Sequence, residues 1–174
     1  MRKFILFVFL LIGFFPVCNL QAKELYVMSK HTEGFLFFIY PQKVPGGKDA
    51  LAKKDLRLDF TYLTSKDSIT LTATYTASQL FPASEVTLLI PDKGRYSFPV
   101  EVIYRDKKKN KWRHRVRFTI PYTLFEEAYQ SPDPYQISFT DEGRSLRYSY
   151  SRGSWNRIKA KMMEIIQVIR LNKE

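Results

Sequence analysis

Residues 56–76 read LRLDFTYLTSKDSITLTATYT, and they decide the fold because their apolar side chains recur at every second position. This period places one row of side chains on the buried face of a strand and the intervening row on the other face. The apolar rows are Leu56, Leu58, Phe60 and Tyr62, and then Leu71, Ala73 and Tyr75. With Lys66 and Asp67 in the loop, the stretch predicts a β-hairpin in which Tyr62 faces Leu71.

Residues 96–120 predict the longest hairpin, because alternating apolar positions run outward to a polar loop at 106–110 and then return. Counting back from the loop places Glu101 opposite Arg115. His114 then falls on the apolar row, so we expect a core or half-buried imidazole there rather than a catalytic base.

The remaining strands are shorter. They are predicted at residues 24–30 and 35–40 around Gly34, at 85–90, and at 135–139 and 146–150. In the last pair, Gly143 can take the positive φ that a tight hairpin turn requires. Residues 41–54 are expected to form a long surface connection, since they contain several turn-forming residues and no alternation.

The apolar period changes to three and four residues near the C-terminus, which is typical of an amphipathic helix. Its apolar positions are Trp155, Ile158, Met162, Ile165, Ile166 and Ile169. We expect a helix over residues 154–171 that packs on the strands, although Trp155 beside Arg157 and Lys159 also suits a membrane interface. A shorter helical turn is predicted at 122–129.

About nine strands with closely spaced turns predict a mainly β fold. The architecture is either an antiparallel two-layer sandwich or a partly open barrel, built from hairpins, with the C-terminal amphipathic helix packed on it. Residues 23–174 are predicted to form this single domain, because a chain of that length buries enough surface to fold without disulfides.

Residues 1–22 have the order of a secretory signal peptide. A cationic start is followed by an apolar run over residues 4–15, and small Ala22 provides the cleavage position. Because the run is shorter than the ~20 residues needed to span a bilayer, we expect cleavage rather than an uncleaved anchor. Lipid attachment at Cys18 is a third, less favoured alternative. The protein is therefore predicted to be exported, to the periplasm or the medium.

The chain is strongly basic, with 28 Lys and Arg against 17 Asp and Glu. Arg2 and Lys3 leave with the leader, so residues 23–174 keep 26 basic groups and a net charge of +9. The single cysteine leaves as well, which excludes a disulfide, a thiolate nucleophile and a cysteine metal ligand in the mature chain. An excess of positive charge favours acidic partners.

The sequence contains no motif for a cofactor, a metal or a serine nucleophile. His31 and His114 lie 83 residues apart, and no calcium-binding loop pattern is present. Gly46, Gly47 and Lys48 resemble a phosphate-binding loop only in part, because Asp49 stands where Ser or Thr is needed. We expect neither a cofactor nor a metal.

A glycan hydrolase with two carboxylates is the enzyme class that the sequence excludes least, because its acid and base can come from unrelated strands. The available acidic residues are Glu126, Glu127, Asp133, Asp141 and Glu142. All of them fall in predicted turns or helices, which explains them without catalysis. We therefore predict a non-enzymatic protein, with a carboxylate-based glycan hydrolase as an alternative.

Eight cationic residues crowd into thirteen positions of the longest hairpin. They are Arg105, Lys107, Lys108, Lys109, Lys111, Arg113, Arg115 and Arg117. The alternation points the last four to one face, about 7 Å apart, since a strand rises roughly 3.3 Å per residue. A row of like charges attracts a polyanion, so these eight residues are the predicted anion-binding site. The alternative is a solvated sheet face whose charges discourage edge pairing.

We therefore expect a binding or assembly module of the cell envelope, with the basic hairpin as its contact surface. The candidate partners are an anionic glycan, lipopolysaccharide or an acidic protein surface, with peripheral membrane contact as a further option. Nucleic acid is not expected, because Trp112 and Tyr104, which could stack on bases, fall on the core-facing row. The alternative is a structural subunit of an envelope assembly that binds no polyanion.

Overall fold

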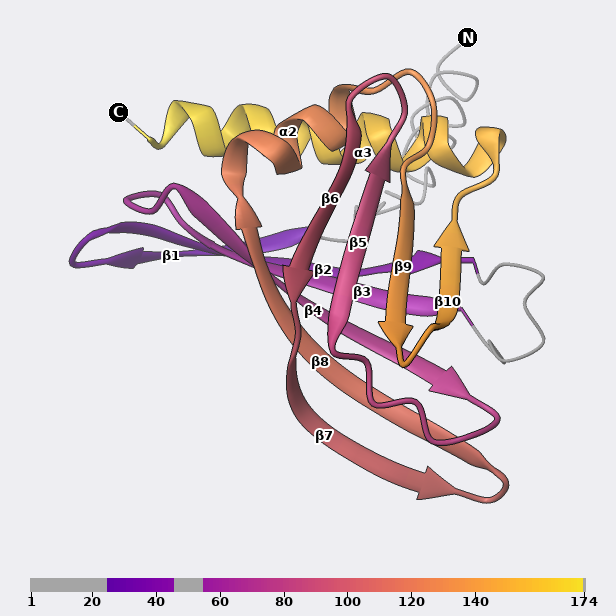
Figure 1. Cartoon of the computed structure of the whole chain (residues 1–174). Coiled ribbons are helices and arrows are strands. Elements are labelled where there is room, and N and C mark those ends of the chain that lie inside the picture. Colours follow the sequence, from indigo (N-terminus) through magenta and orange to yellow (C-terminus); the bar gives the residue numbers. More distant parts are fainter. Residues whose placement is uncertain (1–24, 46–54, 174) are drawn as a thin grey trace, which may run out of the picture.

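The computed structural model describes residues 25–45 and 55–173. The predicted signal peptide, Cys18 and most of the predicted 41–54 connection lie outside the described residues. Within them the protein is mainly β, with ten strands in two antiparallel sheets and two helices (Figure 1). The architecture is a sandwich, because the described strands form two separate sheets and close no barrel.

The larger sheet has the strand order β1-β2-β3-β4-β8-β7. Its strands are β1 (Tyr26–His31), β2 (Gly34–Val44), β3 (Leu56–Leu63), β4 (Ser68–Ala77), β8 (Lys111–Pro121) and β7 (Glu101–Lys108). β2 extends into the predicted surface connection as far as Val44. Pro41 is accommodated because a β-bulge lies between Ile39 and Gln42, where a missing N–H breaks no ladder.

The smaller sheet has the strand order β10-β9-β5-β6. Its strands are β5 (Glu85–Ile90), β6 (Gly94–Pro99), β9 (Gln136–Asp141) and β10 (Arg144–Ser149). Only Glu142 and Gly143 join β9 to β10, and both have positive φ, 45° and 80°. This is the two-residue turn that suits the twist of a hairpin, as the sequence predicts for Gly143.

The prediction of a single hairpin over residues 96–120 is wrong for its first strand. Residues 94–99 pair with β5 in the smaller sheet, and residues 101–108 pair with β8 in the larger one. The chain changes sheets at Pro99, which has no N–H, and at Val100, whose N–H donates to the Ser84 carbonyl at 3.1 Å. The alternation hides this switch because both halves face the same core. The first strand of the predicted hairpin is thus two strands, β6 and β7, and the described residues form ten strands where about nine were predicted.

The β3–β4 hairpin forms with a register two residues away from the predicted one. Phe60 faces Leu71, where Tyr62 was expected, and Leu58 faces Ala73. The shift keeps every apolar side chain on the buried face, because alternate side chains share a face.

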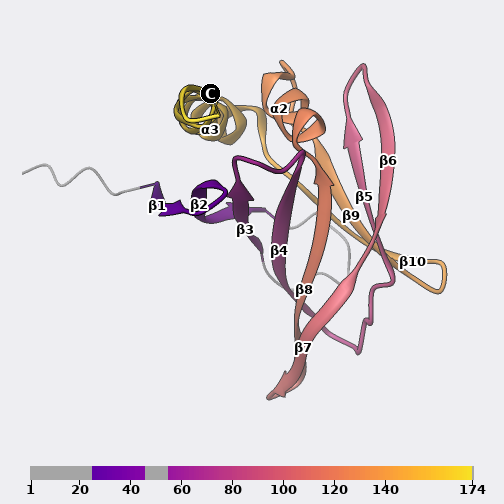
Figure 2. The ribbon, with the colours of Figure 1, turned by 90° about the vertical axis from the view of Figure 1, so that its left-hand side faces the viewer.

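Two helices cover the sandwich, α2 (Tyr122–Gln130) and α3 (Arg152–Leu171). α3 begins two residues before its predicted start, because the Ser151 hydroxyl accepts the Ser154 N–H at 3.4 Å and caps the helix there. Figures 1 and 2 place α3 above β1–β3 and beside α2. Trp155 is fully buried, so the alternative of a membrane interface is wrong for this residue.

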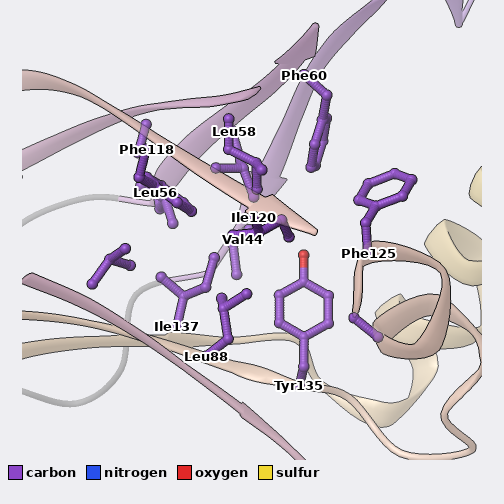
Figure 3. Packing of buried hydrophobic residues seen from close by; sticks show 14 of the residues in the cluster. Val44, Leu56, Leu58, Phe60, Leu88, Phe118, Ile120, Phe125, Tyr135 and Ile137 are labelled. Atoms are coloured by element: carbon purple, nitrogen blue, oxygen red, sulfur yellow. The ribbon is translucent and has the colours of Figure 1, made fainter. Parts of the chain in front are cut away.

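The core lies between the two sheets and beneath the helices. In Figure 3, Leu58, Phe118 and Ile120 of the larger sheet point toward Leu88 and Ile137 of the smaller one. The side chains of the two inner faces thus pack against one another in the core. The outer faces of both sheets are the surfaces available for binding.

Candidate anion-binding site

β8 carries the predicted basic row along the outer face of the larger sheet. The row consists of Lys111, Arg113, Arg115 and Arg117, and it alternates with the inward-facing side chains of Trp112, His114, Val116 and Phe118. β7, at the edge of the sheet, flanks the row on one side, and β4 flanks it on the other.

Two arginines of the row form bidentate ion pairs with β7. Arg113 donates to the two carboxylate oxygens of Asp106 at 2.7 and 3.1 Å, and Arg117 donates to those of Glu101 at 2.7 and 3.1 Å. Glu101 therefore lies opposite Arg117, and its predicted position opposite Arg115 is wrong. Bidentate pairs have a fixed geometry, so they hold the edge strand in register on β8.

Arg115 reaches across β4 to an acid on β3. It donates to the Thr74 hydroxyl at 3.2 Å and to Asp59 Oδ2 at 2.9 Å. Three of the four cations in the row are thus neutralised, which the sequence does not reveal because Asp59 is distant in the chain. The row is a ladder of ion pairs rather than a line of like charges.

Arg115→Met is expected to lower the free energy of unfolding by about 1–2 kcal/mol. The reason is that Asp59, whose side chain is 25% exposed and whose Oδ1 already lacks a hydrogen-bond partner among the described residues, loses its counter-ion. Urea unfolding of Arg115→Met, Asp59→Asn and the double variant measures this coupling. A double variant whose loss equals the sum of the single losses would show that the pair contributes nothing.

The tip of the β7–β8 hairpin gathers the cations that the ladder leaves out. Only Lys109 and Asn110 join the two strands, so the loop is shorter than the predicted 106–110. Lys109 has a φ of 58°, a region that non-glycine residues rarely adopt. Lys108 and Lys111 face each other as the last pair of the two strands.

A hollow of about 540 Å³ opens on the outer face at this tip, and we call it the tip hollow. It is lined by Thr76, Lys108, Lys109, Asn110, Lys111 and Arg113. Arg113 is paired with Asp106, but the three lysines form no ion pair with any described residue. The tip hollow therefore has an excess of positive charge, and Asn110 and Thr76 add neutral hydrogen-bonding groups.

Two of the eight predicted cations face the other side of the hairpin. Lys107 lies with Nζ 5.8 Å from the centre of the Trp112 ring, and Arg105 lies opposite His114. The structure thus brings four of the eight predicted residues together around the tip hollow, places two on the inner face, and engages Arg115 and Arg117 in the ladder.

Tyr104 lies on the outer face, and the prediction that it faces the core is wrong. A β-bulge between Val102 and Tyr104 adds Ile103 and shifts the alternation by one residue. Tyr104 is 36% exposed, and the Arg113 guanidinium lies 5.5 Å from the centre of its ring. An aromatic side chain therefore stands next to the tip hollow.

His114 is buried, as the alternation predicts, with 1% of its surface exposed. Its ring stacks on Tyr75 with 4.9 Å between centroids. Burial lowers the pKa of His114 to about 4. The positive charge of Arg105 also lowers this pKa, whereas the carboxylates of Asp106 and Asp141 raise it. The imidazole is neutral near pH 7 and adds no charge to the hairpin.

Three of the five candidate hydrolase carboxylates are engaged in ion pairs. Glu126 pairs with Arg170, Asp133 with Arg152, and Asp141 with Arg144. Glu127 lines a hollow of about 160 Å³ together with Asp92, an acid for which the alternation gives no signal.

Among the described residues, no three His, Cys, Asp or Glu side chains lie close enough to hold a metal ion together. No helix in residues 25–45 and 55–173 is long and apolar enough to cross a membrane. No family model, curated protein or solved structure matches the chain.

Proposed function

We propose that the protein is an exported, non-enzymatic binding module of the cell envelope, and that the tip hollow holds an anionic glycan. The observation that carries this proposal is the convergence of Lys108, Lys109 and Lys111 on one hollow with no carboxylate in its lining. Ammonium groups held together without counter-ions repel one another, and a polyanion relieves this repulsion.

The position of the tip supports access for a large ligand. In Figures 1 and 2 the β7–β8 hairpin extends beyond the strands of the smaller sheet, at the end of the molecule opposite the helices. A chain-like ligand can therefore pass over the tip hollow without meeting the smaller sheet.

The lining favours a glycan over an acidic protein surface. Thr76 and Asn110 provide hydrogen-bond donors and acceptors beside the cations, and the exposed ring of Tyr104 lies next to them. Hydroxyl groups, anionic substituents and a ring face are combined in a charged sugar. The export of the module rests on the N-terminal leader pattern.

Replacing Lys108, Lys109 and Lys111 by glutamine is expected to weaken heparin binding about tenfold or more at physiological salt, because three ionic contacts are lost. The logarithm of the binding constant should also fall less steeply with the logarithm of salt concentration, by about two units of slope. Heparin is the probe, and affinity is measured by titration at several salt concentrations with the purified protein.

A matched control separates the tip hollow from net charge. Lys30, Lys93 and Arg157 are exposed and lie outside the β7–β8 hairpin, and their replacement by glutamine removes the same charge. The control should bind nearly as the parent protein does, and circular dichroism confirms that both variants fold. Equal weakening of the two variants, or no binding by the parent, contradicts the proposal.

A further inference from the structure

The outer face of the smaller sheet carries a second hollow, of about 190 Å³, which we call the sheet hollow. Its floor and rim include Thr87 of β5, Gln136 and Ser138 of β9, Ser145 and Arg147 of β10, and Arg95 of β6. All four strands contribute, so the sheet hollow lies on the rigid part of the fold and is unrelated in position to the tip hollow.

The register explains why polar groups gather there. Arg147 lies opposite Ser138, Ser138 opposite Thr87, and Thr87 opposite Ser97, so one row crosses the whole sheet. Since the inward-facing neighbours in these strands fill the core, the outward row consists of short hydroxyl side chains between longer ones. Short side chains in the middle and arginines from the two edge strands leave a depression.

The charges of the sheet hollow indicate one anionic group on its ligand. Arg95 forms no ion pair with any described residue, and the lining of the sheet hollow contains no carboxylate. Glu85 lies on the same face beside the hollow, where its carboxylate accepts hydrogen bonds from Ser97 at 3.1 Å and Thr87 at 3.4 Å. This nearby acid disfavours a ligand of high negative charge, in contrast to the tip hollow.

The remaining lining indicates the uncharged part of the ligand. Ser138 and Ser145 each offer a hydroxyl that donates and accepts, and Gln136 offers an amide. The Thr87 hydroxyl, which donates to Glu85, offers its oxygen as an acceptor. A volume of 190 Å³ corresponds to about six water molecules of roughly 30 Å³ each, which is much smaller than a drug-sized site. The ligand therefore has the size of a single sugar ring.

We infer that the sheet hollow binds one acidic monosaccharide unit of the uronic acid type, with its carboxylate at the Arg95 side and its hydroxyl groups on the Thr87, Ser138 and Ser145 floor. A guanidinium binds a carboxylate through paired hydrogen bonds, and hydroxyl side chains match the ring hydroxyls of a sugar. This site is independent of the proposed function of the tip hollow.

The test is a titration of the protein with glucuronate, followed by amide chemical shifts in NMR spectra. We expect saturable shifts in β5, β6, β9 and β10 at millimolar ligand and none in the β7–β8 tip. Arg95→Gln should weaken this binding at least fivefold. Lys93→Gln removes the same charge two positions before Arg95, outside the lining of the sheet hollow, and should leave the binding unchanged.

Two further ligands and one further variant define the outcomes. Glucose that binds as tightly as glucuronate overturns the role of the carboxylate, and acetate that binds as tightly overturns the role of the hydroxyl floor. The absence of shifts in the smaller sheet overturns the site itself. The variant with Lys108, Lys109 and Lys111 replaced by glutamine should keep glucuronate binding, so failure at one hollow is distinguishable from failure at the other.

Discussion

Trp155→Ala is expected to lower the free energy of unfolding by about 3–5 kcal/mol, the largest single effect in this protein. Trp155 is completely buried, and its ring stacks on Tyr129 at 5.6 Å and meets Tyr135 edge-on at 5.4 Å. Its indole N–H also donates to the Ser131 carbonyl at 3.4 Å. One side chain thus joins α3 to α2 and to the segment that enters β9.

Thermal and urea unfolding measure this effect, and a loss of about 4 kcal/mol corresponds to a fall in Tm of about 8–16 °C for a chain of this length. Trp155→Phe keeps an aromatic ring and should lose less. Ile158→Ala, on the half-buried side of α3, is a control for general weakening of the helix. An alanine variant at 155 that unfolds with the parent protein would show that α3 does not depend on this cluster.

Lowering the pH from 7 to 5 is expected to remove about 2 kcal/mol of stability through His114 alone. An unfolded histidine has a pKa of about 6.5, whereas burial lowers the pKa of His114 to about 4 in the folded protein. Below pH 6.5 the unfolded chain therefore takes up a proton that the folded chain accepts only near pH 4. This contribution is fully present above pH 7 and is lost as the pH falls toward 4.

Urea unfolding at pH 7, 6 and 5 checks this dependence before most carboxylates titrate. His114→Phe should flatten it, because phenylalanine can stack on Tyr75 without a titrating group. His31→Gln is the matched control, since it removes the other described histidine, which is exposed at the end of β1. A parent protein whose stability is constant across this range would falsify the assignment.

The alternation in the sequence specifies which face each side chain takes, and these assignments hold for Leu58, Phe60, Leu71 and His114. It does not specify the pairing partner, because a shift of two residues preserves the faces. The β3–β4 register and the pairing of Glu101 with Arg117 could therefore not be predicted from the alternation.

The candidate site could be predicted only in part for the same reason. The concentration of lysines at residues 107–111 is visible in the sequence, but the neutralisation of Arg115 depends on Asp59, two strands away in the sheet. The exposure of Tyr104 depends on the β-bulge between Val102 and Tyr104, and no residue type in this stretch predicts a bulge. The sheet hollow needs four strands from two distant hairpins, so no local pattern could reveal it.

The change of sheets at Pro99 also has a consequence for folding kinetics. β5 pairs with β9 through Thr87 and Ser138, which are 51 residues apart, and β4 pairs with β8 through Tyr75 and His114, which are 39 apart. Such non-local pairing slows folding, to the millisecond-to-second range typical of sandwiches. Because β6 runs directly into β7, neither sheet can be completed while the other is out of place. The edges of the hairpins that form first therefore stay unpaired until the strands of both sheets are in place. The β6–β7 link thus makes the two sheets one cooperative folding unit.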